Sequence, residues 1–196
     1  SSVNLGINST ISLWVKLDSG FDCSLIGETS YQFGYMLYVK ENISFIIRIG
    51  TFYQTFSLVS NQVPKLTAGV WENIVFQRTG DSIEAFLNGV SRETKTGFGT
   101  SVDTLFDTFG SGSTGGSPTE GLIDEIAGWN NNTVDPIDIY NGGTPNDLSL
   151  LATPPTNWYR MGDLVTAFPT IPDVIGTNDG TAYNENEATM VVPDVP

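Results

Sequence analysis

The sequence predicts an all-β fold, a two-sheet antiparallel jelly-roll sandwich with a loop-rich C-terminal extension. Glycine and proline interrupt the 196 residues so often that the longest stretch without either is Tyr35–Ile49, which disfavours long helices. Short apolar segments recur with the period of two that is typical of half-buried strands. Two of these segments are separated by Asn88-Gly89, which indicates a tight hairpin.

Most of the predicted strands lie in the first half of the chain. Alternate residues from Ile11 to Leu17 are apolar and share one face, whereas Ser12, Trp14 and Lys16 share the other. The expected strands are Ile11–Leu17, Gly34–Lys40, Ile43–Ile49, Thr51–Val59, Trp71–Arg78, Ser82–Leu87, Val90–Glu93 and Gly121–Trp129. The side chains expected in the core include Trp14, Phe45, Ile47, Ile49, Val75 and Leu87.

The second half of the chain is less regular. Residues 110–121 are rich in Gly, Ser and Thr and indicate a loop. Asp135-Pro136 begins a short helical turn that runs to Tyr140, because Asp caps a helix start and Pro fits the first turn. Thr156–Met161 and Gly180–Tyr183 are expected as edge or covering strands. Residues 1–196 are predicted to form one domain, with residues 144–196 as an extension that packs on the sandwich or on a neighbour.

The charge balance excludes several partners. The chain has 22 acidic and 8 basic residues, a formal net charge of −14, and the excess is concentrated after residue 96. A surface this acidic repels nucleic-acid phosphates and anionic membranes. No apolar run reaches the length of a membrane span, and no signal peptide is expected.

The residue types also exclude common catalytic chemistry. The chain has no histidine, so Ser-His-Asp and Cys-His catalytic systems and the usual His-ligated zinc sites are ruled out. Cys23 is the single cysteine and is expected to be a small buried hydrophobe.

Several segments, in chain order, resemble the laminin G-like jelly roll of the concanavalin A-like lectin/glucanase superfamily. The segments that carry the resemblance are Thr10–Lys16, Leu66–Trp71, Ile74–Phe76, Ile83–Gly89, Gly121–Ile126 and Tyr140–Gly143. This resemblance implies the fold and leaves the function open, because the superfamily contains lectins, adhesins, enzymes and structural modules.

The C-terminal segments resemble extensions found on laminin G-like proteins of environmental bacteriophages. They are Asn157–Asp163, Asn178–Ala182 and Val192–Pro196. This resemblance implies a non-catalytic structural or display module on a virion surface, as a head decoration or fibre-like protein, with other virion proteins, a cell-surface glycan and further copies of the chain as partners. The alternative is a free or cell-surface lectin or adhesin that acts outside the cell.

The glucanases of this superfamily carry the motif E-x-D-x-E on one face of a strand. The corresponding stretch of this chain is the predicted strand Gly121–Trp129. Here Glu120, Leu122, Asp124 and Ile126 share one face, so the triplet is broken. The resemblance therefore implies no catalytic residue and no enzyme activity.

Two kinds of binding residue remain as hypotheses. The aromatic and amide side chains that could stack on and hydrogen-bond to sugars are Tyr31, Tyr53, Trp129 and Asn130. No cofactor is required, and a structural Ca²⁺ held near Asp124 is the one metal hypothesis. The alternative is that Asp124 accepts backbone N–H bonds from a neighbouring loop while Glu125 lies on the solvent face.

Overall fold

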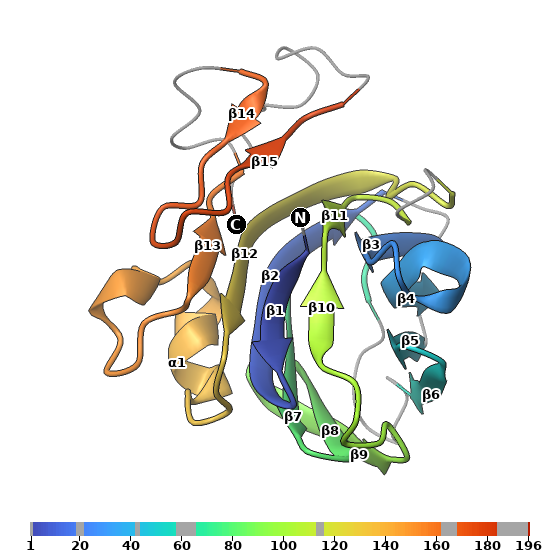
Figure 1. The fold of residues 1–196 in the computed structure, drawn as a ribbon. Helices are drawn as coiled ribbons and strands as arrows, with labels where there is room; N and C mark the ends of the chain where they lie inside the picture. Colours follow the sequence, from blue (N-terminus) through green and yellow to red (C-terminus); the bar gives the residue numbers. More distant parts are fainter. Residues whose placement is uncertain are drawn as a thin grey trace.

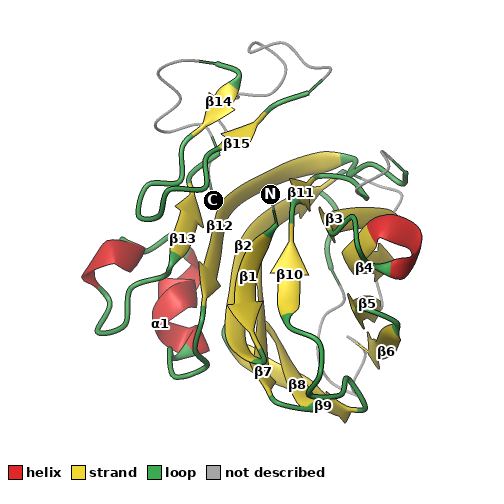
Figure 2. Ribbon diagram, in the orientation of Figure 1, coloured by secondary structure: helices red, strands yellow, loops and turns green. Residues whose placement is uncertain are grey.

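The computed structural model describes residues 2–18, 22–41, 44–57, 66–112, 116–161, 168–183 and 196. Within these residues the regular structure is dominated by antiparallel strands, and the one α-helix is the short α1, Pro136–Tyr140 (Figure 2). The predicted all-β class is confirmed. None of the helices in these segments is long and apolar enough to cross a membrane.

The larger sheet has six strands and brings together segments that are distant in the sequence (Figure 1). β12 pairs with β2 from Gly121 opposite Leu17 to Trp129 opposite Thr10, and the far edge of β2 pairs with β7. In spatial order the strands are β13 (Asn157–Tyr159), β12 (Gly121–Trp129), β2 (Asn8–Leu17), β7 (Glu72–Thr79), β8 (Ser82–Leu87) and β9 (Val90–Thr96).

The second sheet has five strands. They are, in spatial order, β11 (Thr108–Phe109), β3 (Cys23–Gly27), β4 (Tyr35–Lys40), β5 (Ser44–Ile49) and β6 (Phe52–Ser57). The predicted hairpin is formed by β4 and β5, with Leu37 opposite Ile47, although Ile43 lies outside the described residues. Residues 58 and 59 of the strand predicted from Thr51 also lie outside them.

Two short sheets complete the fold. β1 (Val3–Gly6) pairs with β10 (Thr104–Phe106), and β14 (Thr170–Ile171) pairs with β15 (Gly180–Thr181). The described residues also form the single 3₁₀ turns η1 (Gln32–Gly34), η2 (Asn141–Gly143) and η3 (Leu148–Leu150). η1 leads directly into β4, and η2 and η3 follow α1.

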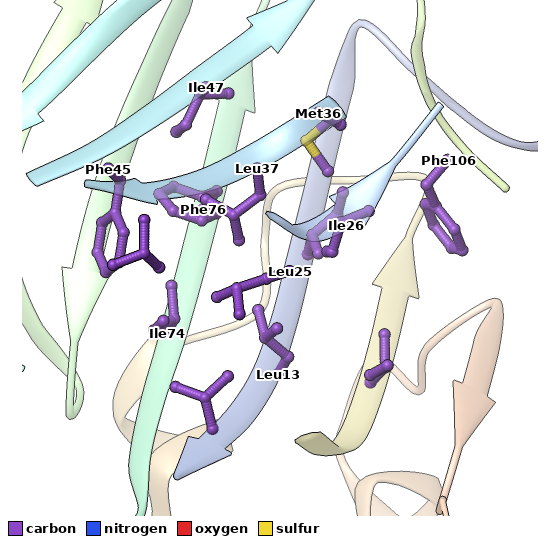
Figure 3. Close-up of a cluster of buried hydrophobic side chains, with 14 of the residues drawn as sticks. Leu13, Leu25, Ile26, Met36, Leu37, Phe45, Ile47, Ile74, Phe76 and Phe106 are labelled. Carbon is purple, nitrogen blue, oxygen red and sulfur yellow. The ribbon is translucent and has the colours of Figure 1, made fainter. Parts of the chain in front are cut away.

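The main core lies between the two larger sheets (Figure 3). Phe45 and Ile47 of β5 enter it from one side, and Leu13 and Ile74 enter it from the other. The rings of Phe45 and Phe76 pack edge to face, with 5.6 Å between their centres. The predicted inward positions of β5 are therefore confirmed. Cys23 is also buried in this core, as predicted, and burial raises the pKa of its thiol to about 11.

The six-stranded sheet is buried on one face by the main core and, over β12, β2 and β7, by a second layer on the other face. Leu87 belongs to the main core as predicted, whereas Trp14 and Val75 are buried on the opposite face of the sheet. The ring of Trp14 stacks on that of Tyr140, the last residue of α1, with 5.8 Å between the ring centres. The expectation that Trp14 and Val75 are buried is confirmed, but they belong to a second layer.

In both the helical turn and the C-terminal extension, an aspartate side chain accepts hydrogen bonds from backbone N–H groups. The side chain of Asp135 accepts a bond from the N–H of Ile137, which confirms the predicted start of α1. Further along, the Asp173 carboxylate accepts bonds from the backbone N–H groups of Trp158 and Gly176, both at 2.9 Å. β13 pairs with β12, so the described part of residues 144–196 contributes one edge strand to the six-stranded sheet.

The hairpin between β8 and β9 has the predicted two-residue tip. Asn88 and Gly89 have φ of 54° and 73°, the left-handed values that a type I′ turn requires. The side-chain oxygen of Asn88 also accepts a 2.8 Å bond from the N–H of Asn73, which ties the tip to β7.

We expect Gly89→Ala to destabilise the protein more than Gly69→Ala. Both glycines have φ of 73°, so either change should cost about 1 kcal/mol in backbone strain. A Cβ at residue 89 would lie 3.3 Å from the Tyr140 ring, whereas a Cβ at residue 69 meets nothing within 4 Å. Gly89→Ala should therefore cost about 1 kcal/mol more in urea unfolding. Equal costs would contradict this account of the tip.

Candidate functional site

The chain itself covers the outer face of the six-stranded sheet, the side that is turned away from the main core. The segment 130–151, which contains α1 and η3, packs along the part of this face that β12, β2 and β7 form (Figure 1). A second cluster of buried hydrophobic side chains joins this segment to the sheet: Val75, Ala127, Trp129, Val134, Ile139, Leu148 and Trp158. We call this side of the sheet the covered face.

A β-bulge in β12 determines which side chains reach the covered face. Asp124 lies opposite Trp14 and Ala127 lies opposite Ser12, so β12 has one more residue than β2 across this interval. Glu125 has a φ of 51°. The extra residue redirects the side chains that follow it. The side chain of Ile126 consequently enters the main core.

The expectation that Glu125 lies on the solvent face is wrong. This residue is 4% exposed, and its carboxylate is held from both sides. Oε2 accepts a 2.6 Å bond from the indole N–H of Trp158, and Oε1 accepts a 3.1 Å bond from Nε of Arg160. The guanidinium of Arg160 also stacks on the Trp158 ring, 5.1 Å from its centre. We call these three residues the Glu125 triad.

The environment of the Glu125 triad favours the neutral acid. Burial, followed by the charge of the neighbouring Asp124, raises the pKa of Glu125 to about 7. Arg160 and the Trp158 hydrogen bond oppose this effect without overcoming it. Both oxygens of Glu125 are engaged, and Oδ1 of Asp124 accepts the backbone N–H of Glu125 at 2.7 Å. Glycoside hydrolysis needs two carboxyl groups beside an accessible bond, and these two are directed into the protein.

Aromatic side chains surround one arginine on the outer face of the five-stranded sheet. Both neighbours of Arg48 in β5 point into the core, so Arg48 points outward. Tyr53 lies opposite Arg48 in β6 and shares that face. The guanidinium carbon of Arg48 lies 4.9 Å from the ring centre of Tyr53 and 5.1 Å from those of Phe33 and Tyr35. We call these four residues the aromatic–arginine cluster.

Two rings of the cluster face solvent while the cation beneath them is buried. Phe33 is 70% exposed and Tyr53 is 58% exposed, whereas Arg48 is 3% exposed. Phe33 has a φ of 67°, a left-handed conformation that costs free energy in a residue other than glycine. Exposed rings that a buried cation holds in place can stack on the apolar face of a sugar.

The structure separates the four residues predicted to bind sugars. Tyr53 is exposed in the cluster, and Asn130 is exposed at the end of β12. Tyr31 and Trp129 are buried, which corrects the expectation that their rings are open to a ligand. The hydroxyl of Tyr31 donates to the carbonyl of Asp103, and the indole of Trp129 donates to that of Thr153.

The structure gives Asp124 no set of partner ligands for a metal. Within the described segments no three Asp, Glu, Cys or His side chains are grouped as an ion would need. Ca²⁺ binding at Asp124 stays a prediction, and a Ca²⁺-dependent rise in melting temperature that Asp124→Asn abolishes would support it.

Sequence reasoning missed Phe33, Tyr35 and Arg48. A signal for Arg48 was present, because a charged residue between two inward-facing isoleucines must point out of the sheet. No comparable signal identifies Phe33, which reaches the cluster from η1 through its unusual backbone conformation.

Two packed antiparallel sheets with an open aromatic face define a lectin-like β-sandwich. The sequence profile of the concanavalin A-like lectin/glucanases superfamily matches residues 2–135, and the chain belongs to this superfamily. No curated protein sequence matches the chain.

Solved structures share the fold at low sequence identity. A putative carbohydrate binding protein from Bacteroides ovatus is 11% identical with a TM-score of 0.65, over 89% of this chain and 51% of that protein. A heptameric SAP-like pentraxin from Limulus polyphemus is 13% identical with a TM-score of 0.53, over 93% and 85%. The binding domain of botulinum neurotoxin serotype D is 14% identical with a TM-score of 0.51, over 72% and 40%. The chain thus spans about half the length of the first of these proteins.

We expect the stability of the protein to fall between pH 5 and pH 8 because of Glu125. Its folded pKa of about 7 lies above the ordinary 4.5, so its contribution is fully present below pH 4.5 and is lost as the pH rises through 7. The loss should be roughly 3 kcal/mol. Glu125→Gln stays neutral and should remove this decrease, measured by urea unfolding at both pH values. A decrease of equal size in the variant would contradict the assignment.

Proposed function

We propose that this chain is a non-catalytic carbohydrate-binding module displayed on the surface of a bacteriophage virion. The observation that carries the proposal is the aromatic–arginine cluster, in which Phe33 and Tyr53 present exposed rings on the open face of the five-stranded sheet. Membership of a superfamily that includes lectins supports it, as does the described function of the Bacteroides ovatus relative.

The lack of catalysis is supported by the covered face. The strand that would carry the glucanase carboxylates holds the broken triplet, and its buried Glu125 is bound by Trp158 and Arg160. Residues 130–151 also occupy the face onto which such carboxylates would project. A sugar chain therefore reaches the five-stranded sheet, where the described residues provide no carboxylate pair.

The virion location is supported by the phage-like C-terminal segments. Two of them fall largely in the described part of residues 157–183, whereas residues 192–195 lie outside it. The strongly acidic second half of the chain suits an outward-facing module that must not bind nucleic acid. The partners are other virion proteins, a cell-surface glycan and further copies of the chain, the last in line with the heptameric pentraxin. The alternative is a free or cell-surface lectin.

Binding of the purified chain to an array of bacterial and plant polysaccharides tests the first part of the proposal. We expect Tyr53→Ala to weaken binding at least tenfold, because stacking of a sugar on this ring would be lost. Tyr183→Ala is the matched control, since Tyr183 is 79% exposed and belongs to the C-terminal extension. Equal effects of the two changes would contradict binding at the cluster.

Two further measurements test the other parts. Polysaccharides that bind should show no new reducing ends after long incubation with the chain, and their hydrolysis would contradict a non-catalytic role. Mass spectrometry of purified virions should detect the chain as a stoichiometric component. Its absence from particles and presence in the medium would favour the alternative of a free lectin.

A further inference from the structure

The five-stranded sheet differs in charge from the rest of the molecule. Its strands β3, β4, β5, β6 and β11 contain no Asp or Glu, although the chain has 22 of these residues. The same strands contain two basic residues, Lys40 and Arg48. The strands of the six-stranded sheet, by contrast, include Glu72, Asp124 and Glu125. The strands of this sheet thus contribute two positive and no negative side chains, whereas the nearest acidic residues, Asp22, Glu28, Glu41 and Asp107, lie in the segments that flank them.

The local charge governs what binds at this sheet. At physiological ionic strength, exposed charges farther apart than about 8 Å are largely screened. The acidic excess of the second half of the chain therefore acts only weakly here. The charge of Arg48 is screened less, because its guanidinium is buried beneath the rings that a ligand would touch.

The positions of the two exposed rings determine how a sugar chain can lie on the five-stranded sheet. The guanidinium of Arg48 is shared by Phe33 and Tyr53, and each of these ring centres lies within 5.1 Å of it. The two ring centres are thus no more than twice that distance apart. Tyr53 belongs to β6, an edge strand, and Phe33 belongs to η1 beside β4. A sugar chain that contacts both rings must therefore lie across the strands.

We propose that the glycan bound at the aromatic–arginine cluster is anionic and carries carboxylate or sulfate groups. This inference rests on the proposed function and specifies the chemical class of its ligand. The rings supply stacking contacts that tolerate different sugars, and Arg48 attracts the anionic substituents. Arg48 also keeps the rings in position, since its Nη2 donates a 3.3 Å bond to the Tyr35 hydroxyl.

Matched pairs of polysaccharides test the charge of the ligand. The full chain is titrated calorimetrically with polygalacturonate and its carboxyl-reduced form, and with dextran sulfate and dextran. We expect the anionic member of at least one pair to bind five- to tenfold more tightly than its neutral partner, because only the anionic member is attracted by the charge of Arg48. The pair that shows the difference distinguishes carboxylate from sulfate. The preference should shrink when NaCl is raised from 50 to 500 mM.

Variants locate the charge that is responsible. Arg48→Met removes the cation while keeping an apolar chain beneath the rings, and it should abolish the preference for the anionic member. Lys95→Met is the control, because it removes one positive charge from β9, where Lys95 pairs with Glu93 at 2.6 Å. Tyr53→Phe keeps the ring and should retain the preference, which provides a second folded variant if Arg48→Met proves unstable.

The outcomes separate this inference from the proposed function. Equal or tighter binding of the neutral members, weakened by Tyr53→Ala, would overturn the anionic class and leave carbohydrate binding intact. An anionic preference that survives Arg48→Met would also overturn the inference, whatever the effect of Lys95→Met. A failure of all four polymers and of the wider array to bind would overturn both proposals.

Discussion

The β-bulge at Glu125 is the constraint on which the arrangement of the molecule depends. By adding one residue to β12, it turns Ile126 into the main core and Glu125 toward the covered face. There Glu125 accepts hydrogen bonds from Trp158 and Arg160, which belong to the C-terminal extension. Arg160 is the single basic residue after residue 96, so the one cationic side chain in the second half of the chain pairs with Glu125.

Because of these contacts, the outer faces of the two sheets differ: one is covered by the chain and the other is open. Trp158 and the segment before it bury the outer face of the six-stranded sheet, and the carboxylates of β12 are buried with it. The five-stranded sheet keeps an open face, where Arg48 gathers three aromatic rings. Structural ionisable groups thus lie on one sheet and the candidate ligand contacts on the other.

Local patterns in the sequence predicted a large part of this fold. The alternation in β5, the Asn88-Gly89 turn and the capped start of α1 depend on neighbouring residues alone, and each was predicted at the correct place. The strands β1, β3, β10, β11 and β14 were missed, because they are short and are defined by their partners. The orientation of Glu125 was wrong for a related reason. A bulge depends on the register between two strands, and the sequence of one strand does not contain it.

The candidate site was harder to predict than the fold. Tyr31 and Trp129 resemble Tyr53 in sequence context, yet tertiary packing buries the first two and exposes the third. The double burial of the six-stranded sheet has a further consequence for how the protein can change over time. A substitution on that sheet disturbs one of two packed layers, whereas the outward positions of β5 and β6 can vary with neither layer disturbed. The open sheet is therefore the part of the chain on which new binding specificities can evolve at little cost to folding.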